Sequence, residues 1–199
     1  MAKSGGRDDI VNRLPFRVNE LDANERAMED VLRPGEEDSM WYVLHARPRC
    51  EKKAAGECVE RAIRHYLPLG KGRSKPKKGQ RRYSFDVPLF PGYLFACMDR
   101  GQRSALLRSG FLVRTIDIVD QGRFLREVRA IHTALSSSAD LVLYPQLKRG
   151  KWVRVVRGPL AGAEGMISQR KDNLRLVLNV SILGQAVAAD IAMEEVELI

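Results

Sequence analysis

Turn-forming residues interrupt residues 150–185 so often that no long helix fits among them, and only the stretch after Gln185 has comfortable helical propensity. Apolar and polar residues alternate from Trp152 to Arg157, and Gly158-Pro159 then turns the chain. Four further apolar runs follow, separated by breaks rich in Gly, Asn and Asp: 166–167, 174–182, 186–191 and 196–199. Short runs bounded in this way are typical of strands and turns. Residues 150–199 are therefore predicted to form a small closed all-β barrel, since closure leaves no exposed sheet edge.

Residues 41–135 show a different pattern, in which strand-like and helix-like segments alternate. Strands are predicted at 41–46, 83–97 and 111–118, a short extended piece at 123–125, and helices at 102–109 and 126–135. From Cys50 to Tyr66 small and apolar residues recur every fourth position, which predicts one amphipathic helix with Cys50 and Cys58 packed in the core. This order predicts an α+β domain with an antiparallel sheet flanked by helices.

The remaining segments divide the chain. Residues 1–40 are predicted to be an N-terminal extension, either a mobile leader or a short docking helix at 19–32, because the apolar stripe there is weak. Met40 also leaves open a start of the chain at that point. The serine-rich stretch that begins at Ser136 predicts a linker at 136–149.

Positive charge is concentrated in the middle of the chain. The protein has a formal net charge of +9, and residues 41–147 carry 20 basic and 9 acidic residues, a net of +11. A glycine-containing loop at 71–82 contains seven basic residues and no acidic one. This distribution predicts a polyanionic partner for the middle segment.

Several functions are disfavoured by the residues that the chain lacks. The three histidines are far apart, no CxxC pair occurs, and no nucleophile, phosphate-loop or dinucleotide motif is present, so we expect no enzyme, metal site or cofactor. No apolar run reaches the 18 or so residues of a membrane span, and the N-terminus lacks a signal sequence. We expect a cytoplasmic monomer.

The run PLFPGYLFA at 88–96 places three aromatic residues around a Pro-Gly step. Proline gives no ladder hydrogen bond and glycine packs nothing, so the run predicts a kinked edge strand or a strand end that presents rings to a partner. Together with Trp41-Tyr42 and the segment GKWVRVVRGPLAGAEGMISQ, this run resembles the NusG/RfaH family of bacterial transcription elongation factors. The resemblance covers residues 41–199 and implies a NusG-type N-terminal domain at 41–135 and a KOW domain at 150–199.

The resemblance implies that an apolar patch of the N-terminal domain binds the clamp helices of the β′ subunit of RNA polymerase. The positions that match this patch are Trp41, His45, Phe90 and Tyr93. Exposed aromatic rings suit an interface because they bury a large area and lose few rotors. The alternative is that the rings fill the core, which we expect for Phe95 and for Trp41, whereas Phe90 and Tyr93 are expected at the interface.

The same resemblance implies that basic residues of the N-terminal domain contact nucleic acid. Arg47, Lys53 and Arg108 match positions that face non-template DNA in sequence-reading members, although each could also be an ordinary solvated residue. Cations in the loop are candidates for contacts with DNA or nascent RNA phosphates: Lys75, Lys77, Lys78, Arg81 and Arg82.

Two departures from the family pattern bear on function. Gly101-Gln102-Arg103 stands where RfaH-type members carry a His-Thr-Thr contact to the polymerase. In the KOW domain, Ile182 and Leu183 lie in a loop that binds Rho or a small-subunit ribosomal protein in the family, but the loop here lacks its aromatic ring. The long N-terminal extension and the basic loop favour a specialised paralogue, with antitermination as the expected activity.

Two alternatives concern the KOW segment. A ribosome- or RNA-binding KOW protein that acts in ribosome assembly or translation is the rival functional class. Some RfaH-type members refold this segment as a helical hairpin, but Gly158, Pro159 and Gly162 would disrupt its first helix. We therefore expect strands, an open polymerase-binding patch, and two domains that tumble independently.

Overall fold

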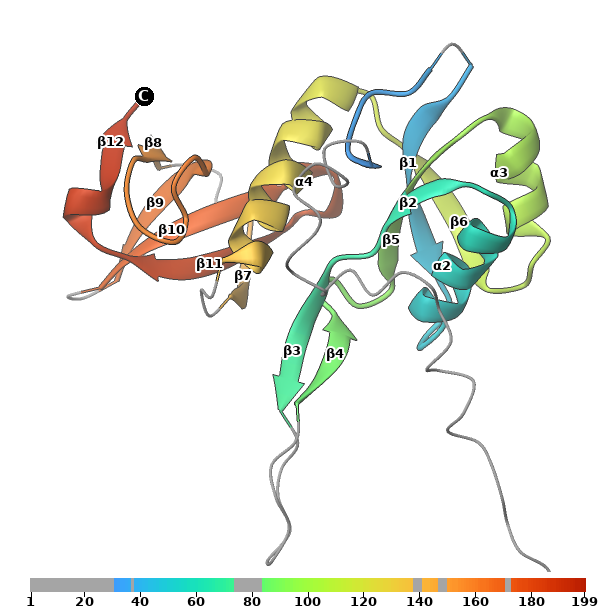
Figure 1. The fold of residues 1–199 in the computed structure, drawn as a ribbon, viewed down its shortest axis with the longest axis horizontal. Helices are drawn as coiled ribbons and strands as arrows, with labels where there is room; N and C mark the ends of the chain where they lie inside the picture. The colour runs from blue at the N-terminus through green and yellow to red at the C-terminus, as the bar shows by residue number, and fades with distance from the viewer. Residues whose placement is uncertain (1–30, 37, 74–83, 138–140, 147–149, 171–172) are drawn as a thin grey trace, which may run out of the picture.

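A computed structural model describes residues 31–36, 38–73, 84–137, 141–146, 150–170 and 173–199 (Figure 1). An α+β region and a C-terminal β-rich region lie on either side of one long helix, α4 (Gln121–Ser136). Residues on both regions contact this helix within one continuous hydrophobic cluster. The α+β class predicted for the N-terminal domain is confirmed.

The N-terminal region is built on a four-stranded antiparallel sheet with the order β2-β5-β1-β6. The central strands are β1 (Met40–Ala46) and β5 (Tyr93–Met98), and β2 (Arg64–Tyr66) and β6 (Leu112–Asp117) form the edges. Because successive side chains of a strand point to opposite faces, the two faces of this sheet bury different residues.

Each face of the sheet is covered by helices. Trp41 and Phe95 point toward α4, where the Phe124 ring lies 5.9 Å from the Trp41 ring and 5.1 Å from the Phe95 ring. Leu44 and Leu94 point to the other face, in a second cluster with residues of α2 (Glu51–Glu60) and α3 (Arg100–Leu107). Burial on both faces explains why β1 and β5 are almost wholly apolar.

Two predicted helix boundaries are wrong for local reasons. The helix expected from Cys50 to Tyr66 ends at Glu60, because Ala62 takes a left-handed conformation (φ 52°) and the chain then enters β2. The extended piece expected at 123–125 lies inside α4, which begins where the Asp120 carboxylate accepts a hydrogen bond from the Arg123 backbone N–H at 2.8 Å. Such an N-cap satisfies a free helix donor.

The C-terminal region is a six-stranded antiparallel sheet with the order β12-β8-β9-β10-β11-β7. Its strands are β7 (Val142–Pro145), β8 (Lys151–Val155), β9 (Glu164–Arg170), β10 (Asn173–Val180), β11 (Gln185–Ile191) and β12 (Val196–Leu198). Short 3₁₀ turns, η1 (Ser181–Leu183) and η2 (Met193–Glu195), precede β11 and β12. The predicted preference for strands over a helical hairpin agrees with this sheet, while its closure as a KOW barrel stays a prediction.

The predicted linker at 136–149 needs a correction, because it contains β7. This strand pairs antiparallel with β11, so its backbone belongs to the C-terminal sheet.

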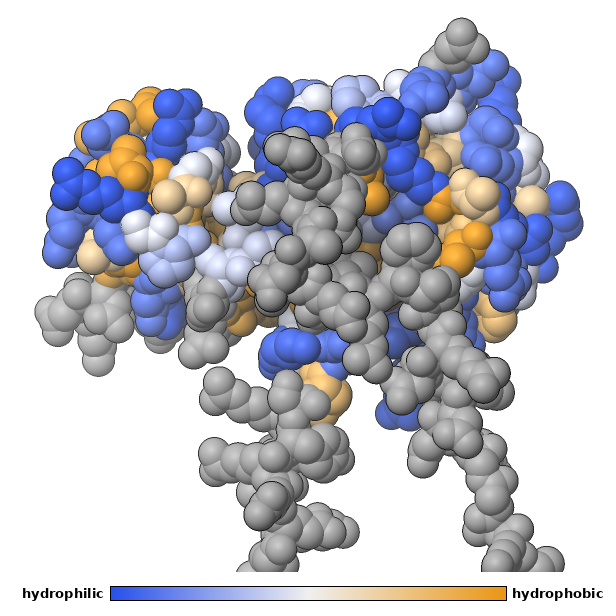
Figure 2. All heavy atoms as spheres, in the orientation of Figure 1, coloured by the Kyte–Doolittle hydropathy of each residue, from blue (hydrophilic) through white to orange (hydrophobic). Residues whose placement is uncertain are grey.

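Hydrophobic residues remain at the surface near the end of the chain (Figure 2), where Leu198 and Ile199 are 68% and 59% exposed.

The segment before β1 packs on the N-terminal region. Leu32 is only 1% exposed, and its carbonyl oxygen accepts hydrogen bonds from the Arg129 guanidinium at 2.6 and 3.0 Å. The Trp41 indole N–H donates to the Arg33 carbonyl at 2.8 Å. The folded region therefore begins before residue 41, and most of the helix predicted at 19–32 lies outside the described residues.

Candidate functional site

Two of the four residues expected to contact the polymerase are buried. Trp41 and Phe90 both have 0% exposure, and Trp41 occupies the core that was also considered for it. The expected exposure of Phe90 is wrong. The Leu89 backbone N–H donates to the Pro68 carbonyl at 2.8 Å, and the turn that follows directs Leu89 and Phe90 into the core cluster.

The other two residues form a partly exposed pair at the end of the sheet. His45 and Tyr93 are register partners on β1 and β5, and their rings stack with centroids 5.0 Å apart and an interplanar angle of 21°. We call them the His45–Tyr93 pair. The His45 Nδ1 atom is buried and has no hydrogen-bond partner among the described residues.

The Pro-Gly step holds this pair in place. Gly92 has φ 85°, a conformation that glycine adopts at little cost, and its N–H donates to the buried Glu51 carboxylate at 2.7 Å. The Gly92 carbonyl accepts from the Ala46 N–H at 2.8 Å. The run at 88–96 is therefore a strand end that positions Tyr93, which is one of the two predicted alternatives.

Five exposed cations lie around the neighbouring end of β1 and the start of β6. The sequence predicted three of them, and the fold adds two, which gives the β1-end patch: Arg47, Arg49, Lys53, Arg108 and Arg114. The Arg47 N–H donates to the Phe111 carbonyl at 2.8 Å, and the Lys53 ammonium lies 5.9 Å from the Phe111 ring centroid. Arg114 is the register partner of His45, which joins the patch to the His45–Tyr93 pair.

The β1-end patch gathers five exposed cations in one part of the surface. Among the described residues, none of its five side chains makes an ion pair. Cations elsewhere do pair, as in Arg61–Glu57 at 2.9 Å and Arg103–Asp117 at 2.9 Å. Unpaired exposed cations leave a local positive potential that attracts a polyanion.

The predicted basic loop joins two strands that project from the body of the N-terminal region (Figure 1). The strands are β3 (Leu69–Arg73) and β4 (Ser84–Pro88). The Lys52 ammonium donates to the carbonyl of Asp86, in the middle of β4, at 2.9 Å. The five candidate cations lie outside the described residues: Lys75, Lys77, Lys78, Arg81 and Arg82. Their contact with nucleic acid stays a prediction.

The predicted partner loop of the C-terminal region contacts α4. The Glu127 carboxylate accepts hydrogen bonds from the Ser181 backbone N–H at 2.8 Å and from its hydroxyl at 2.6 Å, and Arg123 donates to the same hydroxyl at 2.8 Å. Ile182 and Leu183 are partly buried against the main hydrophobic cluster. The expectation of independently tumbling domains is therefore wrong for this conformation.

The Glu127→Ala variant is expected to release this contact. Hydrogen bonds to a charged group contribute about 1.5–3 kcal/mol each, so the docked population should fall roughly tenfold or more relative to the undocked one. Backbone amide shifts of residues 181–184 and the rotational correlation times of the two regions measure the change. Glu60→Ala, at an exposed position of α2, is the control and should change neither. Unchanged shifts in Glu127→Ala would show that other contacts hold the regions together.

A protein-family model described as "Transcription termination factor nusG" matches residues 39–133. The chain therefore contains a NusG-family domain at residues 39–133. Members of this family are transcription factors rather than enzymes, and they bind RNA polymerase. A solved structure described as "Domain interaction in Thermotoga maritima NusG" is 18% identical, covers 81% of this chain and 97% of that chain, and has a TM-score of 0.44. A search of curated proteins found no match.

The NusG domain thus contains both the His45–Tyr93 pair and the β1-end patch. The residues that stand in place of the His-Thr-Thr contact have local roles: Gln102 completes a capping box with Asp99, and Arg103 bonds Thr115 and Asp117. These bonds hold the start of α3 against β6.

In the described part of the chain, no three side chains of His, Cys, Asp or Glu converge in a way that could hold a metal ion. No helix there is long and apolar enough to cross a membrane. Cys58 is buried, and burial raises its pKa to about 12, which makes it a core residue rather than a nucleophile.

Proposed function

We propose that this protein is a transcription elongation factor that binds the clamp helices of RNA polymerase through the His45–Tyr93 pair. The single observation that carries the proposal is the position of this stacked, partly exposed pair beside five cations that have no acidic partner. An aromatic pair gives a compact anchor for a protein partner, and the cations beside it suit the phosphates of DNA that lies close to the polymerase.

The proposed arrangement has two contacts with different chemistry. The His45–Tyr93 pair buries the surface of its two stacked rings against the polymerase. The β1-end patch binds the phosphates of non-template DNA or nascent RNA through charge alone. The basic loop between β3 and β4 adds further positive charge for the same partner. The C-terminal region, as a KOW domain, recruits Rho or a small-subunit ribosomal protein through Ile182 and Leu183 once the contact of Ser181 with Glu127 opens. Antitermination is the proposed outcome.

Affinity purification of the tagged full chain tests the proposal against its rival. The polymerase β′ subunit should be enriched in the wild type and lost from the His45→Ala/Tyr93→Ala variant. Enrichment of ribosomal RNA and ribosomal proteins, with no polymerase, would favour the ribosome-binding alternative instead.

The β1-end patch should set the salt dependence of nucleic-acid binding. Each phosphate contact contributes roughly 0.7 to 0.9 to the magnitude of the negative slope of log affinity against log salt. The Arg49→Gln/Arg114→Gln variant should therefore reduce the magnitude of this slope by about 1.4 to 1.8. Fluorescence anisotropy with labelled single-stranded DNA between about 50 and 200 mM salt measures it. Arg61→Gln is the matched control, because Arg61 is already paired with Glu57. A slope that falls equally in the control would show that only the net charge matters.

A further inference from the structure

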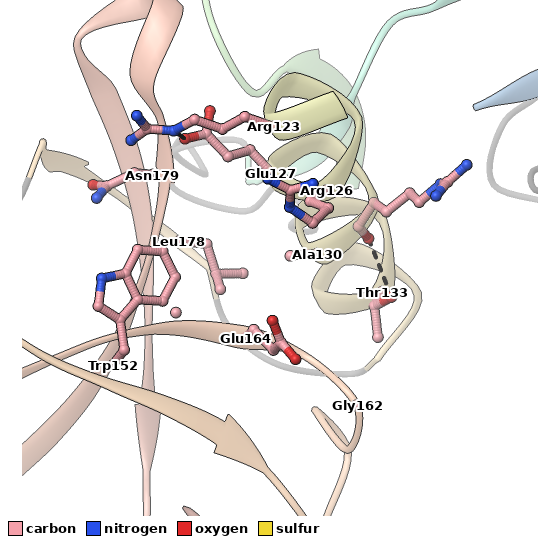
Figure 3. A pocket seen from close by; sticks show the side chains of 12 residues that line it. Arg123, Arg126, Glu127, Ala130, Thr133, Trp152, Gly162, Glu164, Leu178 and Asn179 are labelled. Carbon is pink, nitrogen blue, oxygen red and sulfur yellow. Dashed lines mark hydrogen bonds and ion pairs between the residues drawn. The ribbon is translucent and has the colours of Figure 1, made fainter. Parts of the chain in front are cut away.

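A cavity of about 450 Å³ lies between α4 and the C-terminal sheet (Figure 3). One wall comes from α4 and the other from β8, β9, β10 and the turn before β9. Its volume lies in the range of small-ligand sites. The proposed polymerase contact does not use this cavity, because none of its lining residues belongs to the His45–Tyr93 pair or the β1-end patch.

One cation on the α4 wall is available for a ligand. Arg123, Arg126 and Arg129 follow each other at intervals of three residues and all line the cavity. Arg123 bonds Ser181 and Glu127, and Arg129 bonds the Leu32 carbonyl. Arg126 is exposed and makes no hydrogen bond or ion pair with any described residue. A planar guanidinium in this state suits a phosphate group, which it can bind with two parallel hydrogen bonds.

The opposite wall presents a flat aromatic ring. Trp152 is 44% exposed, whereas Trp41, the other tryptophan of the chain, is fully buried. Figure 3 shows the Trp152 ring beside Leu178, with Arg126 and Ala130 extending from the α4 side of the same hollow. An exposed indole beside small apolar side chains is a stacking surface for another planar ring.

A carboxylate completes the lining. Glu164 lies on the sheet side of the hollow, and its Oε1 atom accepts from the Nε and Nη2 atoms of Arg154 at 2.8 and 2.7 Å. Its Oε2 atom has no bond of this kind among the described residues. A carboxylate oxygen accepts hydrogen bonds from base N–H groups, and guanine presents two such groups on one edge.

We propose that this cavity binds one nucleotide, with its base against Trp152 and its phosphate at Arg126. The cavity presents a stacking ring, a cation and a hydrogen-bond acceptor within one small volume. A nucleotide carries the three matching groups, which are a planar base, an anionic phosphate and a hydrogen-bond donor edge. An aliphatic anion would leave the indole face unused, and a duplex is too large for the hollow. The nucleotide is either free or one unit of a single RNA strand, since both carry the same chemistry.

Tryptophan fluorescence of the full chain tests the proposal. Titration with guanosine 5′-monophosphate, and separately with a short single-stranded oligoribonucleotide, should quench Trp152 with saturation. Trp152→Phe should remove the quenching, because Trp41 is buried away from solvent. Arg126→Gln should weaken the apparent affinity for the monophosphate tenfold or more and leave the affinity for unphosphorylated guanosine unchanged.

Matched controls distinguish a specific nucleotide site from nonspecific attraction of an anion to the basic protein. Arg157→Gln, at an exposed position outside the cavity lining, should keep wild-type affinity. Circular dichroism checks that each variant is folded. Saturable quenching by the monophosphate supports a free nucleotide as ligand, and quenching by the oligoribonucleotide alone supports a strand. No saturable quenching by either up to millimolar concentration, or equal losses in Arg126→Gln and Arg157→Gln, would overturn the proposal whatever the polymerase experiments show.

Discussion

Replacing His45 and Tyr93 together with alanine is expected to weaken binding to RNA polymerase by roughly a few hundredfold or more. A buried aromatic anchor typically contributes about 2 kcal/mol or more at an interface, and the pair supplies two neighbouring rings. Both side chains are only partly buried at a strand end, so the domain should remain folded. The dissociation constant for purified polymerase measures the loss, and circular dichroism checks the fold.

A control separates this effect from a general change of the surface. Val119 is 99% exposed and lies beyond the end of β6, so Val119→Ala should leave the affinity unchanged. A folded His45→Ala/Tyr93→Ala variant that binds as tightly as the wild type would exclude the pair as the polymerase contact. Binding through the β1-end patch would then need direct examination.

The Phe90→Ala variant is expected to lose about 3–5 kcal/mol of unfolding free energy. Phe90 has 0% exposure and belongs to the main hydrophobic cluster, so truncation removes a buried ring and leaves a cavity. Urea unfolding followed by circular dichroism measures the free energy. Phe85→Ala is the matched control, because Phe85 is 44% exposed and its truncation should cost far less.

The same variant also decides between two roles for Phe90. A large stability loss with polymerase affinity retained below the unfolding transition would support a structural role. An unchanged urea midpoint combined with weakened polymerase binding would instead restore the interface role that the sequence pattern suggested.

Periodicity in the sequence predicted the two central strands of the N-terminal sheet but not the exposure of neighbouring rings. The apolar character of 41–46 and 93–97 predicted the central strands correctly, because both faces of that sheet are covered. Phe90 and Tyr93 flank the same Pro-Gly step, and no pattern distinguishes them. The turn after Leu89 does so, and it follows a hydrogen bond from the Leu89 N–H to the Pro68 carbonyl, a residue 21 positions earlier in the chain.

The two cations that sequence reasoning missed have the same explanation. Arg49 and Arg114 are 65 positions apart and join one patch only because β6 pairs with β1. Arg49 could have been found from the sequence, because it lies between Arg47 and Lys53, which were already candidates for DNA contact. The side of the sheet on which β6 pairs could not be obtained from composition or spacing.

The bonds that fix residues 31–36 bear on what a shorter translation product would be. Initiation at Met40 would give a chain with the whole NusG sheet but without Leu32 and without the Arg33 carbonyl that accepts the Trp41 indole N–H. Such a product would lose one buried leucine of the main hydrophobic cluster and the carbonyl that accepts from the Arg129 guanidinium, and it should be more sensitive to proteolysis than the long form.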